Sequence, residues 1–109
     1  MNNSEKVYNL VKKIPLGKVT TYGILAKKAG MNSPRLVGKI LHNNPDPLTI
    51  PCHRVVNSKG ELAKSFAFGG IKGQEEKLRE EGIEVKNGRT DLIKYCSNPN
   101  VWSENWKSW

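Results

Sequence analysis

Apolar side chains recur at helical spacing three times before Asn43, and each run is short and ends at a residue that stops a helix. We predict a first helix between a cap at Ser4 and Pro15, and a second helix that ends at Gly30. A third helix is capped by Ser33 and carries a proline in its first turn, where proline is tolerated. The three apolar stripes are Val7, Leu10, Val11 and Ile14; Tyr22, Leu25, Ala26 and Ala29; and Pro34, Val37, Ile40 and Leu41.

The second and third predicted helices are joined by a short turn at residues 30–32, which matches the size of a helix-turn-helix. In that motif the second helix of the pair contacts DNA. The face of the third helix opposite its apolar stripe carries Arg35, Gly38, Lys39 and His42. A helical hairpin with ordinary solvated charges has the same periodicity, so both interpretations stay open at this point.

The chain after the third predicted helix is rich in turn-forming residues. Segment 43–47 holds two prolines, which stiffen the backbone and favour extended conformations. We predict a short buried extended segment at residues 51–56, a turn at 57–60 and a glycine-hinged loop at 65–70. Helices with only short extended pieces between them predict a mainly α fold with short strands.

A last helix is predicted between this loop and Gly82. Gln74, Leu78 and Glu81 share one of its faces, so we expect Glu81 to face inward. A turn follows at Asn87, and a polar tail begins at about residue 97. Because we find no internal repeat and no second domain, we interpret residues 1–109 as a single domain with a tail that can be flexible.

The net charge favours nucleic-acid binding, and the short apolar runs exclude a membrane-spanning helix. Eighteen Lys and Arg against ten Asp and Glu give a formal charge of +8, which favours nucleic acid, although many basic domains are merely soluble. The apolar runs are far shorter than the roughly 20 residues that span a bilayer. The N-terminus lacks the pattern of a signal peptide, so we expect a cytoplasmic protein, nucleoid-associated when it binds DNA, with reduced thiols and no membrane partner.

Two cysteines and two histidines, Cys52, Cys96, His42 and His53, show no metal-ligand spacing, so we expect no metal site. Cys52 is followed by His53, and a thiol with a reference pKa of about 8.5 needs such a proton acceptor to react near neutrality. Adjacent residues of a strand point to opposite faces, so contact needs a bend, a helical turn or a bridging water. A buried thiol beside a packed histidine is the alternative, and Cys96 is expected to be such a half-buried thiol.

Four segments carry a more specific signal. They occur in the order of a known family, and together they closely resemble the O6-alkylguanine-DNA alkyltransferases. The resemblance runs from about Val7 to Glu84, and the string PCHRV, with Pro51 and Arg54, is its most specific part. The matching segments are residues 14–23 (IPLGKVTTYG), 34–38 (PRLVG), 43–45 (NNP) and 50–56 (IPCHRVV).

The resemblance implies a winged helix-turn-helix domain that binds double-stranded DNA through the minor groove and flips the damaged nucleotide into the protein. Arg35 matches the arginine that is inserted in place of that nucleotide. Gly38 lets the recognition helix approach the groove closely, and Lys39 lies on the same helix. Tyr22 is expected to help swing the nucleotide out of the duplex.

The resemblance also implies a chemistry. Cys52 accepts the alkyl group from O6-alkylguanine, His53 takes the thiol proton through a bound water, and Glu81 orients the histidine. Asn44 shapes the turn beneath the cysteine. No cofactor is implied, and because the thioether product is stable, each molecule reacts once as a methylated-DNA–protein-cysteine methyltransferase.

Some features depart from the family pattern. The loop that usually supplies a tyrosine to the lesion pocket carries Phe66 and Phe68, which lack the hydroxyl, and Leu36 replaces a commonly smaller residue. The family's N-terminal domain is not matched, and the ending at residues 87–92 is similar to alkyltransferase-like proteins, which bind lesions and recruit other repair factors without transfer. That non-enzymatic module is one alternative, and a plain winged-helix regulator with a structural Cys52 is another.

The tail carries three tryptophans, Trp102, Trp106 and Trp109. We expect them to pack on the domain or to stay mobile, and an aromatic contact surface for a partner is the alternative. The protein is expected to be a monomer that can work with repair-protein partners.

Overall fold

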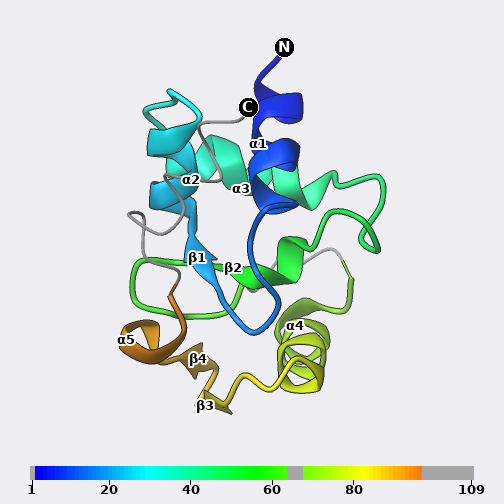
Figure 1. The fold of residues 1–109 in the computed structure, drawn as a ribbon, viewed down its shortest axis with the longest axis vertical. Helices are drawn as coiled ribbons and strands as arrows, with labels where there is room; N and C mark the ends of the chain where they lie inside the picture. The colour runs from blue at the N-terminus through cyan, green and yellow to red at the C-terminus, as the bar shows by residue number, and fades with distance from the viewer. Residues whose placement is uncertain (1, 64–67, 97–109) are drawn as a thin grey trace.

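The computed structural model describes residues 2–63 and 68–96 of the chain. Helices α1 to α3 gather at one end, the β1–β2 ladder crosses the middle, and α4, α5 and the β3–β4 hairpin form the other end (Figure 1). The elements are α1 (Asn3–Val11), β1 (Thr20–Thr21), α2 (Tyr22–Lys28), α3 (Pro34–His42), the 3-10 helix η1 (Cys52–Arg54), β2 (Val55–Val56), α4 (Gly70–Glu80), β3 (Val85–Lys86), β4 (Arg89–Thr90) and α5 (Leu92–Tyr95).

The first predicted helix exists, but both of its predicted ends are wrong. Asn2 is the cap, and its side chain accepts a hydrogen bond from the backbone of Glu5 at 2.8 Å. The α-helix ends at Val11, and the chain then tightens into turns that bring Ile14 into the core at 2% exposure. The early end agrees with Pro15, which has no N–H to donate to the Val11 carbonyl and whose ring would clash with that carbonyl in a continued helix.

The structure confirms that Ser33 caps the third predicted helix, α3. The side chain of Ser33 accepts a hydrogen bond from Leu36 N at 3.1 Å, and Pro34 lies in the first turn. The apolar stripe is confirmed for Val37, Ile40 and Leu41, which are buried. The prediction that Pro34 is buried is wrong, because Pro34 is exposed in the first turn.

The core has two parts that meet at the β1–β2 ladder. The strands are parallel, with Thr20 opposite Val55 and Thr21 opposite Val56. Because successive strand residues point to opposite faces, Val55 packs among α1, α2 and α3, while Val56 packs with Leu78 of α4 and the hairpin. Val55 and Val56, which directly follow the PCHR segment, therefore join the two halves of the molecule.

The prediction for residues 51–56 is only half right. Val55 and Val56 form a strand, but Cys52 to Arg54 form a 3-10 turn instead of an extended segment. The turn is closed by a hydrogen bond from Arg54 N to the Pro51 carbonyl at 3.0 Å. The turn replaces the strand geometry that would point the side chains of Cys52 and His53 to opposite faces.

The C-terminal part contains more structure than the sequence predicts. Strands β3 and β4 form an antiparallel hairpin whose two-residue turn, Asn87 and Gly88, has positive φ angles of 52° and 74°. Asn-Gly is a favoured pair for such a turn. Helix α5 follows, capped by the side chain of Asp91, so α4 is not the last helix.

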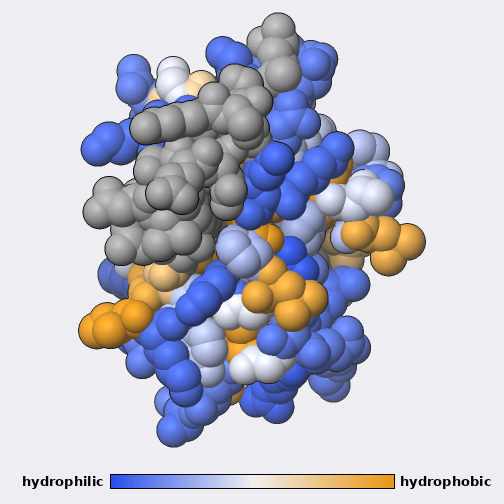
Figure 2. Space-filling view, in the orientation of Figure 1, coloured by the Kyte–Doolittle hydropathy of each residue, from blue (hydrophilic) through white to orange (hydrophobic). Residues whose placement is uncertain are grey.

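The surface in Figure 2 is mainly hydrophilic, with apolar residues in separate patches. Among the described residues, the most exposed large apolar side chains are Leu16, Leu48 and Ile93. They belong to three different segments of the chain. In the described part of the chain, none of the helices is long and apolar enough to cross a membrane.

Candidate functional site

Cys52 begins the 3-10 turn and is only 5% exposed. The backbone ahead of it is held by Asn44, whose Nδ2 donates to the Ile50 carbonyl at 2.8 Å. The same side chain accepts a hydrogen bond from Asp46 N at 2.9 Å, and Cys52 N donates to the Ile50 carbonyl at 2.8 Å. Buried Asn44 thus ties the proline-rich loop to the start of the 3-10 turn Cys52–Arg54, called the cysteine turn below.

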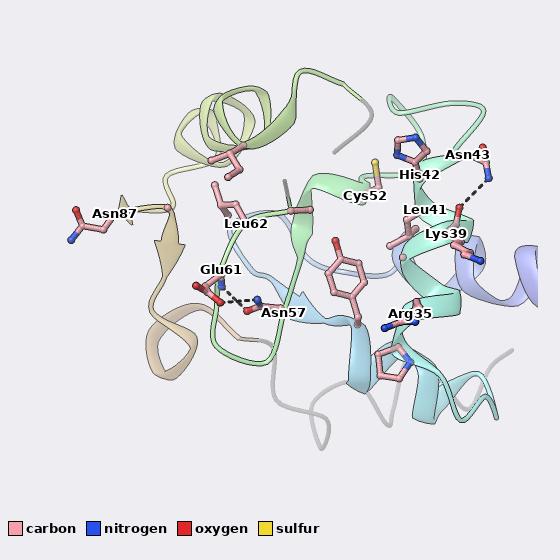
Figure 3. Close-up of a pocket in the computed structure, with 16 residues that line it drawn as sticks. Arg35, Lys39, Leu41, His42, Asn43, Cys52, Asn57, Glu61, Leu62 and Asn87 are labelled. Atoms are coloured by element: carbon pink, nitrogen blue, oxygen red, sulfur yellow. Dashed lines mark hydrogen bonds between the residues drawn. The ribbon is translucent and has the colours of Figure 1, made fainter. Parts of the chain in front are cut away.

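A cavity of about 920 Å³ opens next to the cysteine. One wall is the outer face of α3, and the opposite wall comes from the turn after β2 and from the tip of the β3–β4 hairpin, with Cys52 between them (Figure 3). The α3 wall carries Arg35, Gly38, Lys39 and His42, and the opposite wall carries Asn57, Glu61, Leu62, Ala63, Asn87 and Gly88. A thiol therefore faces a space that also contains cationic side chains of one helix.

The predicted DNA-contacting residues lie together at this cavity. Arg35 and Lys39 are exposed on α3, one helical turn apart. Tyr22, the first residue of α2, is half-buried and also lines the cavity, and burial raises the pKa of its hydroxyl to about 12. A β-carbon placed on Gly38 would lie 4.0 Å from the Tyr22 ring, so glycine keeps this part of the α3 face flat above the tyrosine.

His53 lies directly after Cys52 and contacts Glu81 at the end of α4. Its Nε2 is 2.7 Å from Oε2 of Glu81. Arg54 donates to both oxygens of the same carboxylate, from Nε at 2.8 Å and from Nη2 at 2.9 Å. Its remaining nitrogen, Nη1, donates to the Ile14 carbonyl at 2.8 Å, so Arg54 also fastens the turn to the segment after α1.

The pKa directions define the resting state of these groups. Burial raises the pKa of Cys52, although a hydrogen bond from Asn44 and the charge of Lys77 favour the thiolate. Burial lowers the pKa of His53 in spite of its contact with Glu81. For Glu81, burial raises the pKa, but the hydrogen bonds from Arg54 and His53 outweigh it and the net direction is down.

These directions fix the tautomer of the histidine. Near neutral pH, Glu81 is ionised and accepts hydrogen bonds only, so the Nε2 of neutral His53 carries the proton that it donates. The other ring nitrogen, Nδ1, then carries the lone pair and is the nitrogen that can act as a base. The site at rest therefore contains a neutral thiol, a neutral imidazole of defined tautomer and a carboxylate held by an arginine.

Three predicted pocket or structural residues remain, namely Phe66, Phe68 and Pro51. Phe68 is half-buried and packs against the core cluster of α1 to α3. Phe66 lies outside the described residues. Pro51 is buried and directly precedes the cysteine turn. Within residues 2–63 and 68–96, no group of three or more His, Cys, Asp or Glu side chains could hold a metal ion.

The sequence did not predict two contributions to the site. Asn57, Asn87 and Gly88 line the cavity from the side opposite α3, and the Asn-Gly pair was a signal for the hairpin that positions them. Gln74 was expected on the inner face of α4, but its function was not. It lies fully buried and bonds to the backbone of the cysteine turn.

Known proteins resemble this chain across most of its length. The family model for the DNA-binding domain of 6-O-methylguanine DNA methyltransferase matches residues 2–83. Alkyltransferase-like protein 1 of Schizosaccharomyces pombe is 42% identical over 94 residues, which cover 85% of each chain. The methylated-DNA–protein-cysteine methyltransferase of Methanocaldococcus jannaschii is 56% identical over 66 residues, which cover 61% of this chain and 38% of that protein.

The fold is also similar to solved structures. The crystal structure of S. pombe Atl1 in complex with damaged DNA containing O6-carboxymethylguanine matches with a TM-score of 0.81 and 35% identity. The match covers 89% of this chain and 95% of that chain. The similarity thus includes a protein bound to DNA that carries an alkylated guanine.

Proposed function

Because the chain belongs to the 6-O-methylguanine DNA methyltransferase family, we propose that it repairs DNA by moving an alkyl group from O6 of guanine to the sulfur of Cys52. One observation carries this proposal. The thiol of Cys52 lies at the cavity that the cationic face of α3 also lines, and the next residue, His53, contacts Glu81 through Nε2, which leaves Nδ1 as the basic nitrogen of the ring. DNA held on that face can deliver a base to the thiol only if the base leaves the duplex.

The proposed DNA-binding unit is a winged helix-turn-helix made of α2, α3 and the β3–β4 hairpin. Helix α3 lies in the minor groove, and Arg35 enters the duplex in place of the flipped nucleotide. Lys39 neutralises a phosphate, and Tyr22 supports the flipped nucleotide from the start of α2. The hairpin tip with Asn87 is the wing, since it lines the far wall of the same cavity.

The proposed reaction is a direct displacement at the alkyl carbon. His53 removes the proton from Cys52 through a water molecule, and the thiolate sulfur forms a bond to the carbon while the bond from that carbon to O6 breaks. Guanine leaves as an anion and takes up a proton, which leaves unmodified guanine in the DNA. Glu81 stabilises the positive charge that His53 gains, as the carboxylate beside a catalytic histidine does. The balance requires no cofactor.

A second function, recognition of the alkylated guanine without transfer, is favoured by a different observation. Burial raises the pKa of the Cys52 thiol, so the resting sulfur is a poor nucleophile. In addition, the alkyltransferase-like protein matches over 85% of both chains, whereas the methyltransferase is matched over 38% of its length. The chain would then bind and flip the alkylated guanine without transfer, and other repair proteins would act on the complex.

The two functions separate in one experiment with a matched variant. The wild type and Cys52→Ala are incubated with a duplex that contains one O6-methylguanine, and the DNA is digested to nucleosides and analysed by mass spectrometry. We expect the wild type to remove the lesion in proportion to the protein added and the variant to leave it in place while still binding it. Loss of the lesion with Cys52→Ala, or a lesion left intact by a wild type that binds it tightly, contradicts the transferase.

A further inference from the structure

Gln74 is a fully buried amide that contacts three backbone groups around the cysteine turn. Its Nε2 donates to the His53 carbonyl at 3.0 Å and to the Val55 carbonyl at 2.9 Å. Its Oε1 accepts a hydrogen bond from Ala63 N at 2.8 Å. Gln74 and Leu78 are the two buried residues of α4, and Leu78 serves the apolar core. A second apolar residue would serve packing equally well, so the amide at position 74 needs another explanation.

The positions of the three partners supply that explanation. The cysteine turn is held in front by Asn44, which binds the Ile50 carbonyl, and at its side by Glu81, which binds the side chains of His53 and Arg54. Gln74 holds the carbonyl of His53 itself, directly after the reactive cysteine. The backbone from which the histidine ring projects therefore depends on this amide.

The third bond reaches the cavity. Leu62 and Ala63 line the wall opposite α3, and the N–H of Ala63 is bound by the same amide that binds the carbonyl of His53. One side chain thus sets the separation between the cavity wall and the cysteine turn. We infer that Gln74 is a positioning residue, which places His53 and the wall at Ala63 relative to Cys52. The inference rests on the proposed function for its consequence in repair.

The first test uses the reactivity of Cys52 toward iodoacetamide, with Cys96 of the same molecule as the internal reference. In the wild type, the base His53 makes the rate of Cys52 alkylation nearly independent of pH between the pKa of His53 and the pKa of Cys52. Cys96 reacts faster as the pH rises. Gln74→Met removes all three hydrogen bonds and keeps the size of the side chain. We expect the pH profile of Cys52 in this variant to become like that of Cys96.

The matched control is Leu78→Val, which weakens the packing of α4 and leaves the bonds of Gln74 in place. If this control changes the pH profile of Cys52 as strongly as Gln74→Met does, the role of Gln74 is general packing and the inference is wrong. It is also wrong if Gln74→Met keeps the wild-type profile, or if Cys52 in the wild type already behaves like Cys96.

The second test is Gln74→Glu, which also decides the question if Gln74→Met does not fold. When protonated, the buried carboxylic acid can accept from Ala63 and donate to one of the two carbonyls, but as the pH rises it ionises and faces them as an anion. We expect the ratio of the Gln74→Glu rate to the wild-type rate for Cys52 to fall as pH rises, while circular dichroism shows that the variant stays folded. A constant ratio in the folded protein overturns the inference.

The rate of methyl transfer from a duplex with O6-methylguanine measures what the loss of Gln74 does to repair. At saturating DNA, Gln74→Met should slow transfer about tenfold or more, with lesion affinity changed little, since small misplacements of reacting groups cost rate and not binding. The experiments can refute the proposed function without refuting this inference. If the wild type transfers nothing but the iodoacetamide profile depends on Gln74, the transferase is wrong and the positioning role stands.

Discussion

Replacement of Glu81 by glutamine should destabilise the protein strongly. The carboxylate accepts two hydrogen bonds from Arg54 and one from His53, and the side chains of Arg54 and Glu81 are each 13% exposed. Removal of one partner of a buried ion pair costs about 3–5 kcal/mol because the other charge is left unpaired. Glutamine retains one acceptor oxygen and the pair has some exposure, so we expect a loss of about 2–3 kcal/mol.

Thermal unfolding followed by circular dichroism measures this loss. A loss of this size in a domain of about 100 residues corresponds to a fall in Tm of roughly 10 °C or more. The matched control is Glu80→Gln, one residue earlier and exposed, which removes the same charge and should change Tm very little. A Tm for Glu81→Gln that is indistinguishable from that of Glu80→Gln would refute the central role of the Arg54–Glu81–His53 cluster.

The same variant should change the pH dependence of stability. The pKa of Glu81 lies below its ordinary value of 4.5 in the folded protein, so its stabilising effect is complete above that pH. The effect is lost as the pH falls through the lower, folded-state pKa. The stability difference between the wild type and Glu81→Gln should therefore be constant near neutral pH and shrink only in acid below 4.5. A difference that shrinks between pH 6 and 8 would contradict the assignment.

Three further predictions concern the hairpin, the α3 face and the base. Gly60 has a φ of 81°, and a β-carbon there would collide with a backbone carbonyl of β4, so Gly60→Ala should cost about 2 kcal/mol or more in urea unfolding. Gly88→Ala, with a similar φ but open space, should cost less, and equal losses would be evidence against the collision. Arg35→Ala should abolish the preference for lesion DNA over unmodified DNA at fixed salt, whereas Lys6→Ala should lower both affinities only slightly. The rate of alkyl transfer by the wild type should be nearly independent of pH from about 7 to 8.5. In His53→Gln the rate should be lower and should rise about tenfold per pH unit. Equal pH profiles for the two proteins would exclude His53 as the base.

Local signals in the sequence predict that α1 to α4 exist, but they do not give every boundary and they miss α5. Ser33 with Pro34 marks the start of α3 without ambiguity, because both residues have defined places in the first turn. At the start of the chain Asn2 and Ser4 are both plausible caps, and local chemistry does not choose between them. Asp91 is an N-cap signal that could have predicted α5. The Asn87-Gly88 pair likewise predicts a hairpin more strongly than a simple turn.

The 3-10 turn at Cys52 could not be predicted from local sequence, because distant residues determine it. Cys52 to Arg54 bend into a 3-10 turn in which Asn44 holds the leading end and Gln74 the trailing end. The inward position of Glu81 follows from helical periodicity, but its shared contact with Arg54 and His53 depends on the packing of α4. A buried glutamine has no sequence signature of its own, so only the structure reveals what Gln74 binds.

The central claim is that Cys52 is the acceptor of the alkyl group. Intact-protein mass spectrometry after incubation with a duplex that holds one O6-methylguanine tests it most directly, followed by peptide mapping of Cys52 and Cys96. The account predicts one added methyl group per protein molecule, located on Cys52 alone. An unchanged protein mass despite tight and lesion-selective binding would contradict it and would favour recognition without transfer.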